Sequence, residues 1–223
     1  MTEKEKQQAG ELYNGNDPEL VKDRVSVKKL CMEYNSATYN DYQKRSRLLD
    51  RILPFKGGNT CIEPDFFCDY GYNIELGENF YSNHNLVILD CAEVRFGDNV
   101  FVGPNCSFCT AEHPIDFTVR NKNLEFAKPI KVGNNVWIGT NVCVMPGVTI
   151  GDNVVIGGGS VVVKDIPSNV VAVGNPCKPV KEIPVPSQPV QEISESPVIS
   201  GENLSGEEQK KVKKPKKYTL EEV

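Results

Sequence analysis

A six-residue repeat between Val132 and Val163 constrains the fold of this chain more than any other feature. A helix repeats every 3.6 residues and a simple strand every two, so a period of six predicts a unit of one short strand plus one turn. An aliphatic column recurs at every sixth position, and a column of small or branched residues follows four positions later. The first column is Val132, Ile138, Val144, Ile150, Ile156 and Val162, and the second is Val136, Val142, Val148, Val154 and Ser160.

Each repeat must bury its apolar residues against its neighbours. Strand alternation places Val136 and Ile138 on one face and Trp137 on the other. Gly139 and polar pairs such as Asn134-Asn135 supply the turns, because Gly and Asn tolerate a positive φ. A single hexad cannot bury its apolar side chains alone, so the hexads must stack as in a solenoid. The repeat therefore predicts a parallel β-helix.

The N-terminal segment, residues 1–56, is predicted to be helical. Asp17-Pro18 is a typical helix start, with Asp as the N-cap and Pro at the first helical position, and apolar residues at helical spacing follow. A second helix is predicted from Tyr42 to Leu53, ending before Pro54. We expect these helices to cover the open end of the solenoid, because an uncapped end exposes strand edges.

The repeat continues through residues 57–183 with two irregularities. Between Leu76 and Val94 the hexads fall out of phase, which predicts a distorted coil or a bulge. The pattern then stops at Phe108 and resumes at Ile130. The polar segment 109–129 between them is predicted to be a loop, and loops of this length in compact domains are usually functional or disordered. His113 lies in this segment.

Beyond an extended closing segment, residues 184–223 are rich in Pro, Ser, Glu and Lys and are predicted to form a disordered tail. The basic run 210–217 is interpreted in two ways. It is either a solvated charge run balanced by nearby Glu, which we favour, or a nuclear address or contact with an anionic surface.

Composition points to a cytoplasmic protein with small-molecule chemistry. The net charge of -5 gives no global basic field for nucleic acid, and no apolar run approaches the length of a membrane helix. The eight cysteines are scattered. Cys106 and Cys109 have a metal or redox spacing, but Cys106 continues the inward column of Val100, so a core role is favoured. With two histidines in the chain, no metal site is predicted.

Several local strings carry a family resemblance. They are Cys61-Ile62-Glu63-Pro64, the segment from Cys68 to Ile74, the segment from Asn79 to Asn83, Thr110-Ala111-Glu112-His113-Pro114, the segment from Gly133 to Gly139, and Gly174-Asn175-Pro176. Together they resemble the hexapeptide-repeat sugar O-acetyltransferases over about residues 4–183, most closely the maltose and galactoside enzymes. The resemblance implies a left-handed parallel β-helix, a homotrimer with active sites between subunits, and acetyl transfer from acetyl-CoA to a sugar hydroxyl.

The homotrimer has some support in the repeat itself. The outward positions Trp137, Cys143, Val155 and Val161 are apolar for a solvent-facing wall, and burial against a neighbouring chain would explain them.

The resemblance also assigns site residues. His113 matches the catalytic histidine; a hydroxyl is a poor nucleophile at neutral pH, so a base is needed, and imidazole titrates near neutrality. The acceptor residues implied are Asp17, Arg24, Asp69, Tyr81, Asn83 and Asp90. Asp17 is equally explained as a helix cap, and Cys91 stands where some relatives carry a second acid.

For the acyl donor, the resemblance implies contacts from Trp137, Thr140, Gly158, Val163, Lys164, Lys178 and Lys181. Thr140 would offer its backbone N–H or its hydroxyl to the developing oxyanion. Gly158 would admit the pantetheine arm, and the lysines would face the CoA phosphates, although exposed lysines are also commonly just solvated.

Two alternatives to a sugar acetyltransferase stay open. One is a non-catalytic hexapeptide scaffold, which would keep the inward columns without needing a base. The joint presence of His113, the Trp137–Thr140 wall and the closing Gly-Asn-Pro segment favours an enzyme. The other alternative is acetyl transfer to a non-sugar acceptor such as an amino acid or an antibiotic.

Overall fold

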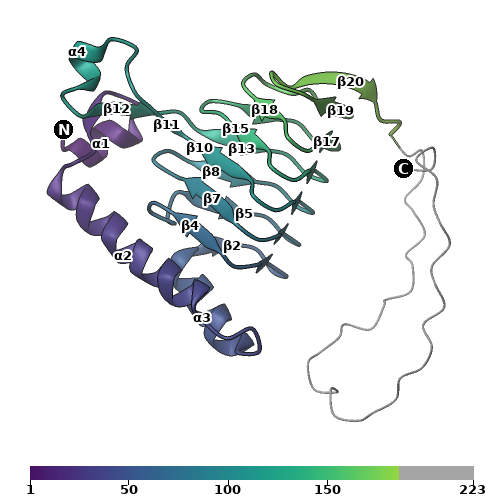
Figure 1. The fold of residues 1–223 in the computed structure, drawn as a ribbon, viewed down its shortest axis with the longest axis horizontal. Coiled ribbons are helices and arrows are strands. Elements are labelled where there is room, and N and C mark those ends of the chain that lie inside the picture. The colour runs from purple at the N-terminus through teal and green to yellow at the C-terminus, as the bar shows by residue number, and fades with distance from the viewer. Residues whose placement is uncertain (186–223) are drawn as a thin grey trace. The chain divides into compact units, whose positions relative to one another are not determined.

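A computed structural model describes residues 1–185, which form a parallel β-solenoid with helices at its N-terminal end (Figure 1). Each coil contributes one short strand to each of three flat walls. Wall 1 consists of β2 (Phe55–Lys56), β5 (Ile74–Leu76), β8 (Val94–Phe96), β13 (Ile130–Val132) and β16 (Thr149–Ile150). Wall 3 consists of β4 (Phe66–Cys68), β7 (Leu86–Leu89), β10 (Ser107–Cys109), β15 (Cys143–Val144) and β18 (Val161–Val162).

Wall 2 lies between them in the chain path and ends in the closing segment. It consists of β3 (Cys61–Ile62), β6 (Tyr81–Ser82), β9 (Phe101–Val102), β14 (Trp137–Ile138), β17 (Val154–Ile156), β19 (Val170–Val173) and β20 (Lys178–Glu182). All neighbours pair in parallel except β19 and β20, which are antiparallel. The predicted parallel β-helix and its extended closing segment are confirmed.

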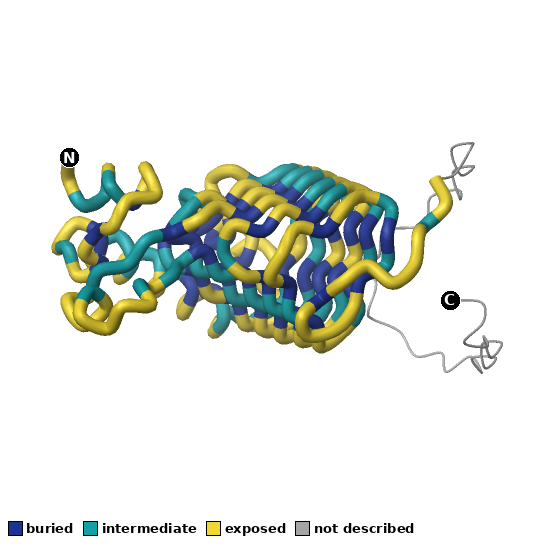
Figure 2. Tube along the Cα trace, turned by 90° about the horizontal axis from the view of Figure 1, so that it is seen from above, coloured by how far each residue is buried: buried dark blue, intermediate teal, exposed yellow. Residues whose placement is uncertain are grey.

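The core is built from the two predicted columns. Val136 and Ile138 are buried, whereas Trp137 between them is 53% exposed, so the predicted alternation is confirmed. Buried and exposed residues alternate along every coil of the solenoid (Figure 2). Phe80, Phe96 and Phe108 fill the middle of the core with edge-to-face contacts, at centroid distances of 5.1 and 4.9 Å.

Asparagines shape the corner between walls 1 and 2. Asn59, Asn79 and Asn99 have φ between 52° and 57°, a conformation that Asn adopts more readily than most residues. Their side-chain amides also stack: Nδ2 of Asn59 donates to Oδ1 of Asn79 at 3.0 Å, and Nδ2 of Asn79 donates to Oδ1 of Asn99 at 3.0 Å. The polar pairs of the repeat thus form a hydrogen-bonded ladder along this corner.

The predicted irregularity lies at the corner between walls 3 and 1. Hydrogen-bonded partners in successive coils lie 20 residues apart in the first coils and 18 apart in the later ones. The inward residues Ile88 and Val94 bracket the wider corner, which contains Asp90 and Cys91, whereas Val144 and Val148 bracket a tighter one. The extra residues form a protruding corner rather than a bulge within a strand.

Three helices come before the first coil in the chain: α1 (Glu3–Gln8), α2 (Pro18–Asn35) and α3 (Tyr42–Ile52). Asp17 caps α2 by accepting a hydrogen bond from the backbone N–H of Glu19 at 2.9 Å, as predicted. Leu48, Leu49 and Ile52 of α3 join the core cluster of the first coil. Because these side chains pack against the solenoid core, α3 covers its open end.

The segment 109–129, predicted to be a loop, contains regular structure. It forms an antiparallel hairpin of β11 (Ala111–Glu112) and β12 (Leu124–Ala127), with the short helix α4 (Phe117–Arg120) at its tip. The strand β1 (Tyr13–Asn14) adds to the other side of β12, so the predicted helical segment also contributes a strand. This sheet could not be predicted from the sequence, because strands of two to four residues show no periodicity.

Other predictions concern the ends of the chain. The first strand of the solenoid, β2, begins at Phe55, just before the predicted boundary at residue 57. The predicted disordered tail and the basic run 210–217 lie outside the described residues, except for the first two positions of that tail. No helix within residues 1–185 is both long and apolar enough to cross a bilayer.

Candidate active site

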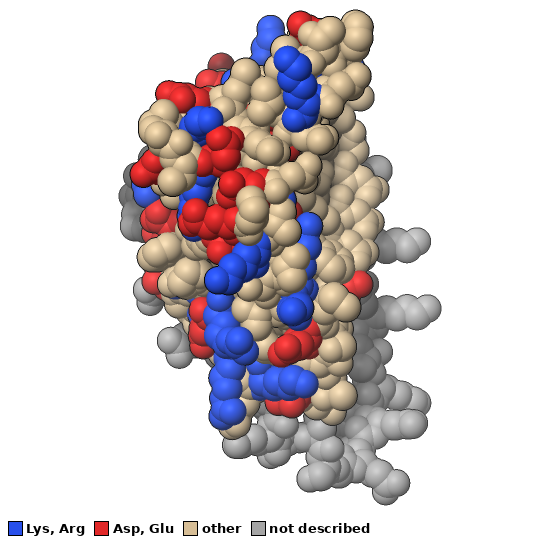
Figure 3. All heavy atoms as spheres, turned by 90° about the vertical axis from the view of Figure 1, so that its left-hand side faces the viewer, with Lys and Arg blue, Asp and Glu red and all other residues tan. Residues whose placement is uncertain are grey.

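A cavity of about 350 Å³ lies where the wall 3–wall 1 corner meets the N-terminal segment and the β11–β12 hairpin. Three parts of the chain that are remote in sequence therefore build it. The lining residues are Gly15, Asn16, Arg24, Asp69, Leu89, Cys91, Ala111, His113, Asn123 and Glu125. Six of the ten lining residues have polar side chains, and both acidic and basic groups are among them. Acidic and basic side chains also both occur over the molecular face that carries the N-terminal helices (Figure 3).

His113 follows β11 directly and reaches this cavity from the hairpin. Its side chain is 58% exposed, and its Nε2 lies 3.9 Å from Oε2 of Glu125. Glu125 belongs to β12, the central strand of the small antiparallel sheet, and its side chain is 17% exposed. A histidine and a carboxylate therefore face the same cavity from one hairpin.

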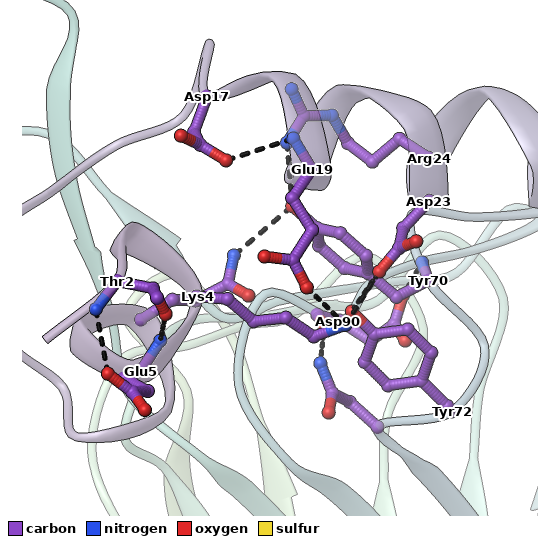
Figure 4. Close-up of polar contacts among 12 residues, drawn as sticks. Thr2, Lys4, Glu5, Asp17, Glu19, Asp23, Arg24, Tyr70, Tyr72 and Asp90 are labelled. Atoms are coloured by element: carbon purple, nitrogen blue, oxygen red, sulfur yellow. Dashed lines mark hydrogen bonds and ion pairs between the residues drawn. The ribbon is translucent and has the colours of Figure 1, made fainter.

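Arg24 ties α2 to the protruding corner (Figure 4). Its guanidinium donates to the hydroxyl of Tyr70 at 2.6 Å and also to the backbone carbonyl of Gly15. These two hydrogen bonds hold the segment before α2 against the corner. They thereby position Gly15 and Asn16, which form one wall of the cavity. Arg24, predicted as an acceptor residue, thus lines the cavity and also holds it together.

Asp69 lies on the same corner, and its side chain is 13% exposed. Its Oδ1 lies 3.4 Å from Nζ of Lys28, and its Oδ2 accepts a weak hydrogen bond from the Cys91 thiol at 3.8 Å. Burial raises the pKa of Cys91 to about 12, so this thiol stays protonated at neutral pH and can donate.

Asp90 does not line the cavity, although it was predicted as an acceptor residue. It is fully buried, and its carboxylate accepts backbone hydrogen bonds from Asp69 and Tyr70 at 2.9 Å and from Gly71 at 2.7 Å. Burial raises the pKa of Asp90 to about 6, which the three backbone donors oppose. The physical role of Asp90 is to organise the corner that presents Asp69.

The other predicted acceptor residues lie elsewhere. Asp17 is the N-cap of α2 and is next to Asn16, but it is not among the lining residues. Tyr81 lies on the outer surface of wall 2, and Asn83 follows it at the corner between walls 2 and 3. Within one chain, therefore, His113, Arg24 and Asp69 come together, whereas Tyr81 and Asn83 do not join them.

The predicted acyl-donor residues lie on wall 2, at two corners and on the closing strand β20. Thr140 and Gly158 stack at the wall 2–wall 3 corner, next to the outward Trp137: the N–H of Gly159 donates to the carbonyl of Thr140 at 2.8 Å. The Thr140 hydroxyl donates to the carbonyl of Pro104 at 3.1 Å. An added Cβ at Gly158 would lie 3.1 Å from the Thr140 carbonyl oxygen, so this approach favours glycine.

Val163 and Lys164 follow β18 at the wall 3–wall 1 corner, along the same edge as the hairpin. Lys178 and Lys181 lie on β20. None of these predicted donor residues lines the cavity around His113.

Seven lining residues were not predicted as site residues: Gly15, Asn16, Leu89, Cys91, Ala111, Asn123 and Glu125. Asn123 and Glu125 belong to the insertion singled out for its length, which was the available signal. Within residues 1–185 no group of three or more His, Cys, Asp or Glu side chains is arranged to hold a metal ion, and Cys106 is buried in the core.

Comparison with known proteins agrees with this architecture. The maltose acetyltransferase hexapeptide capping motif matches residues 6–57, and the bacterial transferase hexapeptide (six repeats) matches residues 129–164. A putative acetyltransferase of Saccharomyces cerevisiae is 53% identical over 175 residues, covering 78% of this chain and 89% of that protein.

Solved structures agree as well. The crystal structure of a maltose O-acetyltransferase from Clostridium difficile 630 is 49% identical with a TM-score of 0.82, covering 83% of this chain and 99% of that one. A galactoside acetyltransferase in complex with coenzyme A is 42% identical with a TM-score of 0.80, covering 82% and 92%.

The stacked six-residue repeat and the capping motif place this chain in the class of hexapeptide-repeat transferases. Within that class, this chain belongs to the acetyltransferase family that carries the maltose acetyltransferase capping motif. The family predicted from the local strings is confirmed.

Proposed function

We propose that this protein transfers the acetyl group of acetyl-CoA to a hydroxyl of a neutral sugar, with His113 as the general base. The observation that carries the proposal is the position of His113: its imidazole opens onto a polar cavity built by the N-terminal segment, the solenoid corner and the hairpin. A base within reach of a bound hydroxyl is what acyl transfer to an alcohol requires.

The proposed reaction needs no covalent enzyme intermediate. The imidazole takes the proton of the acceptor hydroxyl while the oxygen attacks the thioester carbonyl. The resulting tetrahedral oxyanion collapses, the C–S bond breaks, and the CoA thiolate takes a proton from the imidazolium. The backbone N–H or hydroxyl of Thr140 is the proposed donor to the oxyanion.

The cavity lining supports a neutral, hydroxyl-rich acceptor. Asn16 and Asn123 can both donate and accept hydrogen bonds, and the carboxylates of Asp69 and Glu125 accept them from hydroxyl groups. Arg24 directs donors to Tyr70 and Gly15, and the carboxylates of Asp69 and Glu125 lie in the same lining, so an anionic group would meet two negative charges there. We therefore expect sugar phosphates and uronic acids to be poor acceptors.

Some predicted site residues line the His113 cavity, whereas others lie on wall 2 and its corner with wall 3. This separation supports a homotrimer with active sites between subunits. Tyr81, Phe101 and Trp137 are in register on the outer surface of wall 2, where Phe101 is 50% exposed. Wall 1, by contrast, presents Glu75 and Arg95 to solvent, joined by an ion pair of 2.7 Å. An apolar wall on one side of a prism suits a heterologous interface that closes into a ring.

In such a ring, wall 2 of one subunit and its corner with wall 3 would face the His113 cavity of the next subunit. Tyr81, Asn83, Trp137, Thr140 and Gly158 would then complete the site from the neighbouring copy. The galactoside acetyltransferase that resembles this chain was solved with coenzyme A, which supports the proposed donor.

The experiment that tests the function is an acetyl-CoA turnover assay that detects the released thiol, run with maltose, glucose and a galactoside. We expect turnover with at least one sugar and a loss of kcat of about 10²- to 10⁴-fold in His113→Ala, with trimer and CoA binding unchanged. Unchanged turnover in His113→Ala would refute the role of the base. Turnover confined to amino acids or aminoglycosides would replace the sugar as the acceptor.

A further inference from the structure

Glu125 was absent from the sequence prediction, and the reaction as proposed so far gives it no role as a partner of the base. From its position we infer that Glu125 is a positioning residue for His113: its carboxylate holds the imidazole and stabilises the imidazolium formed during acetyl transfer. This inference rests on the proposed function, because it needs His113 to be the base.

The backbone holds Glu125 firmly. It lies on β12, which pairs with β11 on one side and with β1 on the other, so Tyr13 is its partner across the sheet. Its side chain is 17% exposed, whereas that of His113 is 58% exposed. The carboxylate is therefore the more enclosed member of the pair, and the more exposed imidazole lies beside it.

The opposite side of the cavity leaves room for this carboxylate. An added Cβ at Gly15 would lie 2.5 Å from Oε1 and 2.9 Å from Cδ of Glu125. The absence of a side chain at Gly15 thus opens the place that the carboxylate occupies. Arg24 holds Gly15 there through its backbone carbonyl.

The neighbouring cations are engaged elsewhere. Lys128 follows β12 directly, and its Nζ lies 2.6 Å from Oε2 of Glu112. The Nζ of Lys28 lies 3.4 Å from Oδ1 of Asp69. Arg24 donates to Tyr70 and Gly15. Within residues 1–185, the one basic nitrogen that lies within 4.0 Å of the Glu125 carboxylate is Nε2 of His113, at 3.9 Å from Oε2. A positive charge that develops on the imidazole is thus met by a carboxylate that no other cation neutralises at this distance.

The test measures kcat and KM with acetyl-CoA and maltose, or whichever of the assayed sugars is turned over. We expect Glu125→Gln to lower kcat about fivefold, with less than a twofold change in KM for acetyl-CoA, because a partly exposed ion pair is worth about 1 kcal/mol. Glu112→Gln is the matched control on the same hairpin. Its carboxylate pairs with Lys128 and does not line the cavity, so its kcat should stay at the wild-type value.

Gly15→Ala provides a second variant that keeps the carboxylate. The new methyl group would displace the end of the Glu125 side chain, so kcat should fall as in Glu125→Gln. Wild-type kcat in both variants would overturn the inference.

The decisive measurement is a double-mutant cycle. If Glu125 acts through the imidazole, Glu125→Gln should have no further effect on the residual turnover of His113→Ala. A further fivefold loss in that background would mean that Glu125 acts independently of His113, and the inference would fall. A fully active His113→Ala would instead overturn the proposed function itself, so the two failures are distinguishable.

Discussion

The fully buried carboxylate of Asp90 accepts a hydrogen bond of 2.7 Å from the backbone N–H of Gly71, one coil earlier at the same wall 3–wall 1 corner. Two more backbone N–H groups, those of Asp69 and Tyr70, share the same carboxylate. A single side chain thus sets the backbone that carries Asp69 into the candidate active site. The corner was recognisable in the sequence only as a break in the repeat.

The first prediction concerns pH. Burial raises the pKa of Asp90 from 3.8 to about 6, so the folded state binds a proton at Asp90 more tightly than the unfolded chain does. The contribution of this bound proton to the free energy of unfolding is fully present below about pH 4 and is lost as the pH rises through 6. Asp90→Asn removes the titration. The free energy of unfolding of wild type minus that of Asp90→Asn should therefore fall by roughly 2.4 kcal/mol between pH 4 and pH 7.

Urea unfolding at fixed protein concentration measures this difference. The exposed Asp98, whose Oδ1 accepts a hydrogen bond from the N–H of Glu78 at 2.8 Å, is the control. Asp98→Asn should change the pH dependence little. A difference between wild type and Asp90→Asn that is flat or grows towards pH 7 would contradict the raised pKa.

The second prediction concerns the asparagine ladder. Asn99 has a φ of 57°, accepts from the Asn79 amide at 3.0 Å and donates to the Asn135 amide at 3.3 Å. Asn99→Ala loses both hydrogen bonds and places Ala at a positive φ, so the free energy of unfolding should fall by about 2 kcal/mol. Asn99→Gly keeps the backbone conformation available and should recover about half of this loss. Equal destabilisation of the two variants would mean that the amide ladder, and not the backbone, accounts for the effect.

The solenoid could be predicted well from the sequence, because each coil is specified by a local pattern that repeats every six residues. Val136 and Ile138 point inward for the same reason as the equivalent residues of the other coils, so one hexad predicts the next. The site does not share this property. Glu125 meets Gly15 through the pairing of β1 with β12, two short strands far apart in the chain, and neither has a periodic pattern. Asp90 was predicted to contact the acceptor, because a polar residue type alone does not show whether its partner is a ligand or the backbone.

The third prediction concerns assembly. Phe101 lies between Tyr81 and Trp137 on wall 2, outside the set of predicted donor and acceptor residues. If wall 2 is buried between subunits, Phe101→Asp places a charge in an apolar interface and should convert the trimer to monomers. Light scattering after size-exclusion chromatography gives the mass directly. Lys131→Glu, on the outer surface of wall 1, is the control and should remain trimeric. A trimeric Phe101→Asp would exclude this wall as the interface.

The last prediction separates direct transfer from an acyl-enzyme. Cys91 is the thiol that lines the cavity, and it is 5% exposed, with its Sγ 3.8 Å from Oδ2 of Asp69. A thiol attacks as its thiolate, and with a pKa of about 12 only about one molecule in 10⁵ carries that thiolate at pH 7. Cys91→Ser keeps a donor of similar shape to Asp69, so kcat should stay within about threefold of wild type. Mass spectrometry of the wild-type protein mixed with acetyl-CoA, without acceptor, should show no acetyl group on Cys91. An acetylated Cys91 peptide together with an inactive Cys91→Ser would replace direct attack with a two-step mechanism, in which His113 would activate the thiol first and the acceptor second.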